Sequence, residues 1–382
     1  MPGGNSRHIA FFDYTEYNLH SSFRFLWRVC MKKVILLAPT PPPVGGIAMW
    51  TSRMLKAKLK NGWQVDVVDE KVIGNREVFG DKTKRNLFQE IKRCLQIWGQ
   101  LNKKLKDKDF SVVHACIPAN TLPILREYIC ACITKLHKRK FIVHFRCTVP
   151  NMVKSRFNRF MLKRICNISD CVMLLNQQSV DFVSPLTKTK LQLIPNFVDG
   201  AEIVEEHTTR ETLAKALYVG GVIETKGCMD ILQLAKQFPQ VEFRLVGKAE
   251  GKVEQAAQQL PNVVLPGVLN REQLRQEFAD ADVFLFLSYF VGEGFSNALA
   301  EAMAAGLPCL VSDWAANKDM IEDKGGCAVP IKSPEAAAQA LQQMMSPEVR
   351  RAQSAFNIEK IKTVYADDTV LGQYVDCYES LC

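Results

Sequence analysis

Several features that mark other classes of protein are missing from this sequence of 382 residues. No apolar run approaches the ~20 residues that a helix needs to cross a bilayer. The 13 cysteines form no CxxC pair, so we expect no zinc site, and without a secretory signal we expect reduced, intracellular thiols. No G-x-G-x-x-G follows a strand pattern with an acidic residue placed for a ribose, which disfavours a nicotinamide dehydrogenase. No recognised nucleic-acid-binding module occurs, and we expect no nucleic-acid partner.

The composition is that of a globular protein, but its charge is unevenly distributed. Hydrophobic residues make up 47% of the chain and charged residues 23%, and its length suits two domains with a core each. Residues 31–200 carry 30 Lys and Arg against 12 Asp and Glu, whereas residues 201–382 carry 16 against 26. This asymmetry predicts that the first half faces a polyanion, and we favour an anionic membrane surface over nucleic acid.

Strand patterns alternate with helix patterns through both halves, which predicts an α/β protein with two doubly wound, Rossmann-like domains facing one cleft. We divide the chain into an N-terminal domain, 31–200, a C-terminal domain, 201–350, and a C-terminal helical segment, 351–382, that can cross back to the first domain. Residues 1–30 are expected to lie outside the fold, with translation beginning at Met31. Alternatively, they form a short peripheral amphipathic segment.

The most informative stretch follows an apolar strand pattern at 283–288 and begins Gly292-Glu293-Gly294-Phe295-Ser296-Asn297. Its glycines permit a tight turn and the close approach of a ligand, and Ser296 or Asn297 can cap the Ala-rich helix that follows. A strand, a glycine turn and a helix N-terminus predict an anion site. Glu293 and, eight residues later, Glu301 are placed to accept hydrogen bonds from hydroxyl groups.

Other strand ends carry further candidate residues. Open α/β sheets place ligands at the C-terminal ends of their strands, and His144 with Arg146 occupies such an end after the strand pattern at 140–147. His114 ends another strand and is either functional or bonded to nearby backbone. Lys226 follows a strand and a glycine pair at a helix start, where a cation is a poor cap but a good partner for a pyrophosphate.

Residues 153–166 are predicted to form an amphipathic helix. Phe157, Phe160, Met161 and Ile165 share one face, and basic residues crowd the rest, namely Lys154, Arg156, Arg159, Lys163 and Arg164. This pattern is typical of a helix in an anionic membrane interface and also of a surface helix packed on a sheet. We favour the membrane interpretation because the whole half of the chain is basic.

Taken in order, these motifs resemble those of the family 4 retaining glycosyltransferases, which have the GT-B fold. The resemblance covers roughly residues 31–370. It rests on Gly45-Gly46 after the first strand, on Ile194-Pro195-Asn196-Phe197-Val198-Asp199, on Val219-Gly220-Gly221 with Lys226-Gly227, and above all on the Glu-x7-Glu spacing from Glu293 to Glu301 with the sequence up to Pro308.

The resemblance implies a role for each matching residue. Glu301 would hold the ribose, Glu293 the sugar hydroxyls, and His144 or Arg146 would face the sugar. Lys226 and the amides around Phe295, Ser296 and Asn297 would bind the diphosphate, and Gly247 and Val268 would lie near the base. Gly45 and Gly46 would close over the donor from the first domain, which is the acceptor side, whereas the second domain binds the donor. The other donor-binding residues that the resemblance implies are Gly220 and Gly294. The reaction it implies retains the anomeric configuration and needs neither a metal nor another cofactor.

One departure from the family's pattern concerns how the diphosphate leaving group is stabilised. The diphosphate arginine of the family is Gly221 here, so one positive charge is missing unless Arg146 or Lys248 supplies it.

We therefore expect a glycosyltransferase that moves a hexose-type sugar from a nucleotide sugar, with uridine diphosphate as the expected carrier, to a lipid-linked or cell-surface polysaccharide acceptor. We expect it in the cytoplasm, peripheral at the inner face of the membrane. Two alternatives stay open. One is a nucleotide-sugar epimerase of the same fold, and the other is a non-catalytic or low-activity nucleotide-sugar-binding partner, which the missing arginine allows.

Overall fold

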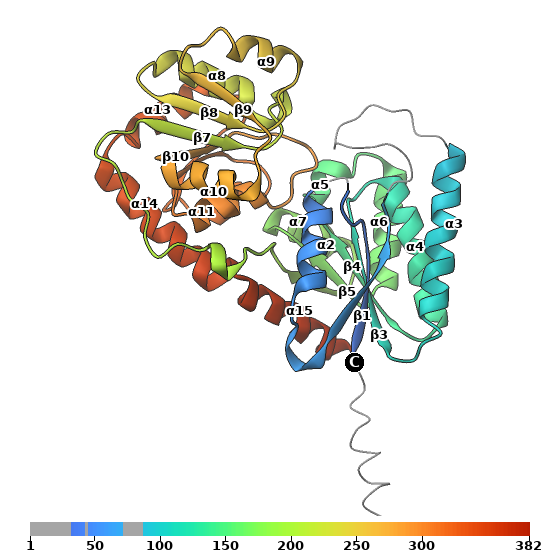
Figure 1. Cartoon of the computed structure of the whole chain (residues 1–382). Coiled ribbons are helices and arrows are strands. Elements are labelled where there is room, and N and C mark those ends of the chain that lie inside the picture. The colour runs from blue at the N-terminus through green and yellow to red at the C-terminus, as the bar shows by residue number, and fades with distance from the viewer. Residues whose placement is uncertain (1–31, 43–44, 72–86) are drawn as a thin grey trace, which may run out of the picture.

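The computed structural model describes residues 32–42, 45–71 and 87–382, which form two α/β domains (Figure 1). The expected extension at residues 1–30 lies outside the described residues. No helix in the described ranges is both long and apolar enough to cross a membrane.

The first domain is built on a six-stranded parallel sheet in the order β2-β1-β3-β4-β5-β6. Its strands are β1 (Lys33–Ala38), β2 (Gln64–Asp69), β3 (Phe110–Ile117), β4 (Lys140–Phe145), β5 (Cys171–Leu174) and β6 (Lys190–Leu193). The four inner strands, β1, β3, β4 and β5, are largely apolar and buried, as expected for strands that are covered on both faces.

Helices cover both faces of this sheet. One face packs against α3 (Leu87–Lys104), α4 (Thr121–Leu136) and α6 (Arg156–Ile168), with the short α5 (Val149–Met152) and α7 (Gln177–Val183) near its C-terminal edge. The other face packs against α2 (Gly46–Lys56) and the last helix, α15 (Asp367–Leu381). Because side chains alternate along a strand, Ile35 and Leu37 join the first core, and Val34 and Leu36 the second.

The second domain has a six-stranded parallel sheet in the order β12-β11-β10-β7-β8-β9. Its strands are β7 (Lys215–Val219), β8 (Glu242–Val246), β9 (Val263–Gly267), β10 (Val283–Phe286), β11 (Cys309–Ser312) and β12 (Gly326–Val329). Its helices are α8 (Cys228–Gln237), α9 (Gly251–Ala257), α10 (Arg271–Asp280), α11 (Asn297–Ala304), α12 (Asn317–Ile321), α13 (Pro334–Gln343) and α14 (Pro347–Lys360).

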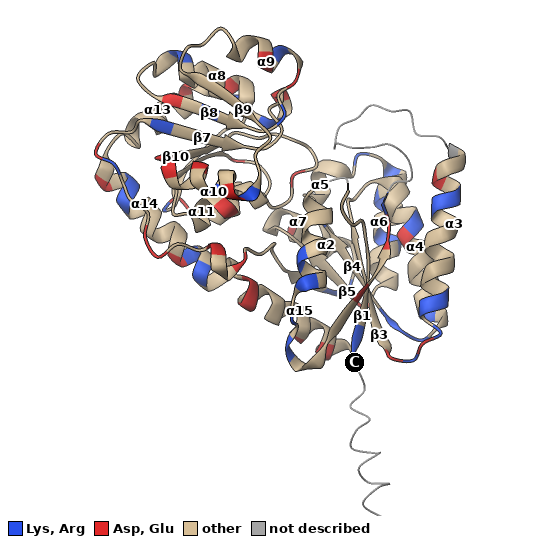
Figure 2. Ribbon diagram, in the orientation of Figure 1, with Lys and Arg blue, Asp and Glu red and all other residues tan. Residues whose placement is uncertain are grey.

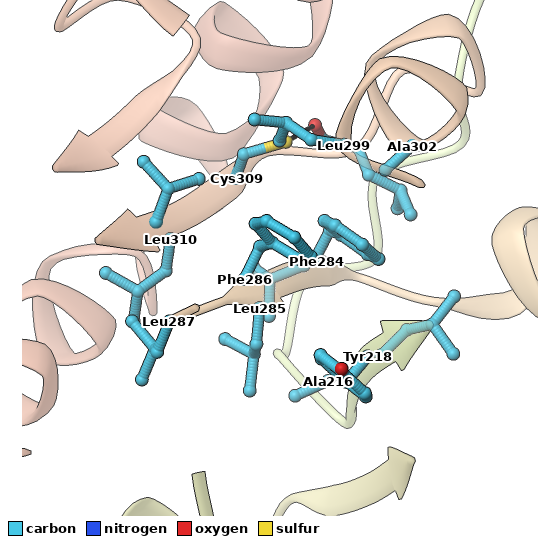
Figure 3. Close-up of a cluster of buried hydrophobic side chains, with 14 of the residues drawn as sticks. Ala216, Tyr218, Phe284, Leu285, Phe286, Leu287, Leu299, Ala302, Cys309 and Leu310 are labelled. Atoms are coloured by element: carbon cyan, nitrogen blue, oxygen red, sulfur yellow. Dashed lines mark hydrogen bonds between the residues drawn. The ribbon is translucent and has the colours of Figure 1, made fainter. Parts of the chain in front are cut away.

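Aromatic side chains fill the middle of the core of the second domain (Figure 3). Tyr218 of β7 stacks on Phe286 of β10 with ring centroids 6.4 Å apart, and Phe286 stacks on Phe284 at 6.2 Å. All three side chains are buried. They fix β7 and β10 side by side, and these two strands carry the loops of the candidate site.

The chain passes between the domains twice, at neighbouring positions. The first passage follows β6, and the second continues from α14 through a π-helical turn (Ile361–Tyr365) into α15 (Figure 1). The two passages are hydrogen-bonded to each other, because the Val198 amide donates to the Tyr365 carbonyl at 2.9 Å and the Asp367 amide to the Val198 carbonyl at 2.9 Å. The last helix therefore belongs to the core of the first domain, although the preceding helix packs on the second.

Each sheet reverses its strand order at one point, which is where doubly wound sheets bind ligands. In the second sheet this point lies between β7 and β10, and in the first sheet between β1 and β3. The loops that follow these strands carry Lys226, Glu293 and the Gly45-Gly46 pair.

Candidate functional site

Lys226 and Glu293 meet at the point where the second sheet reverses its strand order. Lys226 ends a short turn after β7, Glu293 lies in the loop after β10, and Lys226 Nζ is 2.6 Å from Glu293 Oε2. Their side chains are 21% and 11% exposed, and the ammonium also lies over the ring of Phe290 at 4.8 Å. Two residues 67 positions apart in the sequence thus form one partly buried charged pair that a ligand could still reach.

The loop that carries Glu293 is pressed against the first domain. The Thr148 amide donates to the Glu293 carbonyl at 2.9 Å, and Asn176 Nδ2 donates to the Gly294 carbonyl at 3.1 Å. A Cβ on Gly294 would lie 2.9 Å from the Cα of Cys147. The close approach that this glycine permits is therefore made by the backbone of the first domain and not by a ligand.

Helix α11 begins where an anion site was expected. Ser296 caps it, because its side chain accepts a hydrogen bond from the Leu299 amide. Asn297, the first helical residue, is bonded across the domain boundary, since Asn196 Nδ2 donates to Asn297 Oδ1 at 2.8 Å and to the Phe295 carbonyl at 3.4 Å. The first domain therefore orients the N-terminus of α11.

Glu301 has a partner that the sequence did not suggest. Arg53 of α2 donates from Nη2 to Glu301 Oε1 at 2.8 Å and from Nη1 to the Phe197 carbonyl at 2.9 Å. Burial raises the pKa of Glu301, whereas Arg53 lowers it in part. A ribose bound to Glu301 would have to share the carboxylate with this guanidinium.

Arg146 lies just after β4, beneath the same junction. Its Nη2 donates to Asn196 Oδ1, its guanidinium lies 4.5 Å from the ring centroid of Trp50, and its side chain is almost fully buried. Through Asn196 it is one side chain away from the first residue of α11. Lys248, the other candidate for the missing charge, is exposed and paired with Glu250 at 3.4 Å.

His144 is fully buried and lies behind Arg146. Its Nε2 is 3.3 Å from Arg146 Nη1 and its Nδ1 is 3.1 Å from His114 Nε2, while His114 Nδ1 is 2.8 Å from the Tyr378 hydroxyl. In this arrangement His144 contacts Arg146, and it has no nitrogen left to contact a sugar. The sequence did not single out Tyr378, because no local pattern links it to strands more than 200 residues earlier.

His114, Cys116 and His144 also form a possible metal-ligand group, since their ligand atoms lie within 4.8 Å of one another. However, all four imidazole nitrogens already have hydrogen-bond partners. The expectation that the reaction needs no metal stays a prediction.

The remaining glycines have different surroundings. A Cβ on Gly247 would lie 1.8 Å from the Gly220 carbonyl oxygen, so the ends of β7 and β8 need this glycine for their own packing. A Cβ on Gly46, at the start of α2, would meet no atom within 4 Å. Val268, just after β9, is 78% exposed. Gly46 and Val268 therefore leave room for a ligand, as their expected places around a donor require.

Comparisons with known proteins agree with this architecture. The structure resembles a sucrose-phosphate synthase from Thermosynechococcus elongatus, with a TM-score of 0.74, 18% sequence identity, and coverage of 92% of this chain and 99% of that one. It also resembles HepE from Anabaena, solved in complex with UDP-glucose, with a TM-score of 0.68, 16% identity, and coverage of 91% and 99%. The fold is therefore GT-B, the two-domain fold of many glycosyltransferases.

The second domain matches a known protein family. Residues 214–347 match the family described as Glycosyl transferases group 1. Over 254 residues the chain is 24% identical to alpha-galactosylglucosyldiacylglycerol synthase of Streptococcus pneumoniae, covering 60% of this chain and 66% of that protein. The chain spans no more than 66% of the length of the curated relatives that it matches. The second domain of this chain is thus similar to the group 1 glycosyltransferases.

Proposed function

We propose that this protein is a retaining glycosyltransferase that moves a hexose from a UDP-sugar to a lipid-linked or cell-surface polysaccharide acceptor. The observation that carries the proposal is the Lys226–Glu293 pair beside the N-terminus of α11, where the sheet reverses its strand order. The uridine nucleotide is supported by the likeness to HepE, which was solved with UDP-glucose. The acceptor is supported by the glycolipid named for the Streptococcus pneumoniae relative.

In this proposal the diphosphate lies between Lys226 and the first amides of α11. The ammonium of Lys226 carries a full positive charge, and the helix N-terminus carries the positive end of the helix dipole. Both would stabilise the negative charge that develops as the diphosphate leaves. Arg146 supplies further positive charge in place of the arginine that is absent at Gly221. Glu293 accepts hydrogen bonds from the sugar hydroxyls, and Glu301 from the ribose.

Retention of configuration follows if the acceptor hydroxyl attacks from the face that the diphosphate leaves. The bond between the anomeric carbon and the diphosphate oxygen breaks, and its electron pair goes to the diphosphate. The acceptor oxygen bonds to the anomeric carbon, and its proton passes to a diphosphate oxygen. We propose that positive side chains, without a metal, offset the departing charge.

We further propose that the protein works in the cytoplasm at the inner face of a membrane, docking through α6. Phe157 and Phe160 are 54% and 56% exposed. The sequence had placed them on one face with Met161 and Ile165, but only those two are buried against the core. Figure 2 shows Lys and Arg along α6 and α3. A hollow of about 510 Å³ between α4 and α6 is lined by Tyr128, Phe160, Lys163, Arg164, Asn167 and Ile168.

Exposed aromatic rings flanked by cations suit an interface of acyl chains and anionic head groups better than they suit water. The same helix would hold the first domain, and with it the acceptor side, against the surface that carries a lipid-linked acceptor.

A thermal-shift screen tests the donor part of the proposal. The intact protein is heated with uridine, guanosine, adenosine and thymidine diphosphates and with their common sugar conjugates. A ligand at a hundredfold excess over its Kd stabilises the native state by ~3 kcal/mol, which is readily measured. We expect a rise with uridine diphosphate in the native protein and a much smaller rise in Lys226→Met. A rise with another nucleotide alone would contradict the uridine assignment.

Enzymatic assays separate the proposed transferase from its alternatives. An epimerase would convert the nucleotide sugar without an acceptor, and a non-catalytic partner would bind nucleotide but never release it from a sugar. Transfer that requires an acceptor and yields the retained anomer supports the proposal.

A vesicle-sedimentation assay tests the membrane part. Reversal of four basic residues at α6 should abolish pelleting with anionic vesicles, and the residues are Lys154, Arg156, Arg159 and Lys163. A matched control reverses four exposed lysines of the second domain, Lys236, Lys252, Lys318 and Lys324, and should pellet as the native protein does. Undiminished pelleting of the α6 variant would make α6 a structural helix only.

A further inference from the structure

We infer that His114 and Tyr378 are positioning residues of the site: with His144 they form a buried hydrogen-bond chain that holds the Arg146 guanidinium toward the N-terminus of α11. The last helix, α15, would thereby be part of the site, connected to α11 through both histidines, Arg146 and Asn196. That a ligand binds Arg146 rests on the proposed function, whereas the hydrogen-bond chain does not.

The hydrogen-bond chain links three elements on the face of the first sheet that packs against α2 and α15. His114 comes from β3, His144 from β4 and Tyr378 from α15, and all three side chains are fully buried. Their polar atoms follow one another at 2.8 Å, 3.1 Å and 3.3 Å, from the Tyr378 hydroxyl through both imidazoles to Arg146 Nη1. Trp50 of α2 packs edge-on against both imidazoles. Its ring centroid is 5.6 Å from that of His114 and 6.0 Å from that of His144.

The direction of every hydrogen bond follows from the guanidinium, which only donates. His144 Nε2 must therefore accept from Arg146, and the proton of a neutral His144 lies on Nδ1. That proton is donated to His114 Nε2, so the proton of His114 also lies on Nδ1 and is donated to the Tyr378 hydroxyl oxygen. The guanidinium at one end and the Tyr378 hydroxyl at the other thus favour the same pair of tautomers.

Both histidines have to be neutral for this sequence of bonds to exist. Burial, with a smaller contribution from the Arg146 charge, lowers the pKa of His114 to about 3 and that of His144 well below its ordinary value. Both histidines are therefore neutral at the pH at which the protein would work, and the hydrogen-bond chain is formed.

The other end of Arg146 is connected to the site through Asn196. Its Nη2 donates to Asn196 Oδ1, and Asn196 Nδ2 donates to Asn297 and to the Phe295 carbonyl at the start of α11. A guanidinium held on both sides keeps one orientation, whereas a free one samples many and loses that freedom on binding a ligand. Loss of the Tyr378 hydroxyl would leave the His114 Nδ1 proton without an acceptor and favour the Nε2 tautomer. His114 would then donate to His144 Nδ1, and the proton of His144 would lie on Nε2, where it faces Arg146 Nη1 and cannot accept its hydrogen bond.

The test compares two tyrosines on α15. Tyr378→Phe removes the acceptor at the end of the chain. Tyr374→Phe is the comparison variant, because this hydroxyl lies beside Trp50 and Arg146 and is not a partner of either imidazole, so its loss leaves both tautomers unchanged. Both rings are fully buried and both variants keep their packing. The measurements are the imidazole nitrogen chemical shifts of the intact protein, the Kd for uridine diphosphate and kcat/KM for transfer.

The nitrogen shifts of His114 and His144 are assigned by their loss in His114→Gln and His144→Gln. We expect Nδ1–H tautomers for both rings in the native protein and in Tyr374→Phe, and a change of tautomer in Tyr378→Phe. Tyr378→Phe should also weaken nucleotide affinity and kcat/KM by about tenfold, the effect of one lost hydrogen bond of ordinary strength, while Tyr374→Phe stays within about twofold.

Three outcomes would overturn the inference. An Nε2–H tautomer on either histidine of the native protein would contradict the chain. Equal effects of the two tyrosine variants on the histidine tautomers would reduce Tyr378 to core packing. A changed tautomer with unchanged nucleotide affinity would show that the chain does not position Arg146. If the native protein binds no nucleotide, the proposed function fails, and the tautomers still decide whether the chain exists.

Discussion

Replacing Glu293 by Gln should separate nucleotide binding from sugar transfer. Glu293 pairs with Lys226 at 2.6 Å, so in the unliganded protein it neutralises the cation that the diphosphate would use. The substitution keeps the shape of the side chain and removes its charge. We expect tighter binding of uridine diphosphate together with a large loss of transfer.

The size of each effect follows from the geometry. A phosphate that replaces Glu293 on Lys226 would lie roughly 6 Å from the carboxylate, and two such charges repel by about 1.4 kcal/mol at an effective dielectric constant of about 40, between those of protein and water. Removal of that repulsion corresponds to about tenfold tighter binding of the diphosphate. The lost hydrogen bonds from sugar hydroxyls to a charged carboxylate, at about 1.5–3 kcal/mol each, should lower kcat by roughly 100-fold or more.

Isothermal titration with uridine diphosphate and a transfer assay measure the two effects in the same preparation. Glu224→Gln is the control, because Glu224 lies two residues from Lys226, is exposed, and has no ion-pair partner within the described ranges; both quantities should stay within about twofold of native values. Weaker binding of uridine diphosphate in Glu293→Gln would refute the competition for Lys226, and near-native transfer would remove Glu293 from the site.

Three further predictions concern single contacts. Lys226→Met, which keeps the apolar contact with Phe290, should weaken uridine diphosphate binding by roughly 10- to 100-fold in titration calorimetry, and unchanged affinity would exclude Lys226 from the diphosphate site. Arg53→Met should lower the free energy of unfolding by about 1–2 kcal/mol in urea titrations, and Arg53→Met with Glu301→Gln should recover part of that loss; additive effects would show that the pair is not coupled. His114 has a folded-state pKa of about 3 and an unfolded value near 6.5, so its contribution to stability is present above pH 6.5 and is lost as the pH falls toward 3. His114→Gln should therefore reduce the slope of unfolding free energy against pH by about 1.4 kcal/mol per unit between pH 4.5 and 6, and an unchanged slope would contradict the low pKa.

The strands and the glutamate-containing loop could be predicted from the sequence because each is specified locally. An apolar run of four to six residues, a glycine turn and a capping serine such as Ser296 lie within one short stretch, so their pattern survives in the linear order. The fold class follows from the repetition of that unit. The same holds for Lys226 and Glu293 as separate candidates, since each follows its own strand.

The contacts between the domains could not be predicted in this way. Arg53 and Glu301 are 248 positions apart, and Asn196 and Asn297 are 101 apart, so no periodicity relates them. The outward direction of Phe157 and Phe160 is a similar case. Helical spacing puts them near the apolar face, and only the packing of α6 against α4 decides which side chains that face buries.

The placement of positive charge has a consequence for how a donor would be held. An arginine at position 221 would lie on the second domain with Lys226. The two cations that we propose for the diphosphate come from both domains, since Lys226 belongs to the second and Arg146 to the first. A diphosphate held by both would tie the domains together, and the second domain alone would hold it with one cation fewer. Because a charged hydrogen bond contributes about 1.5–3 kcal/mol, the isolated second domain should bind nucleotide more than tenfold more weakly than the whole chain. The first domain would then take part in donor binding as well as in presenting the acceptor.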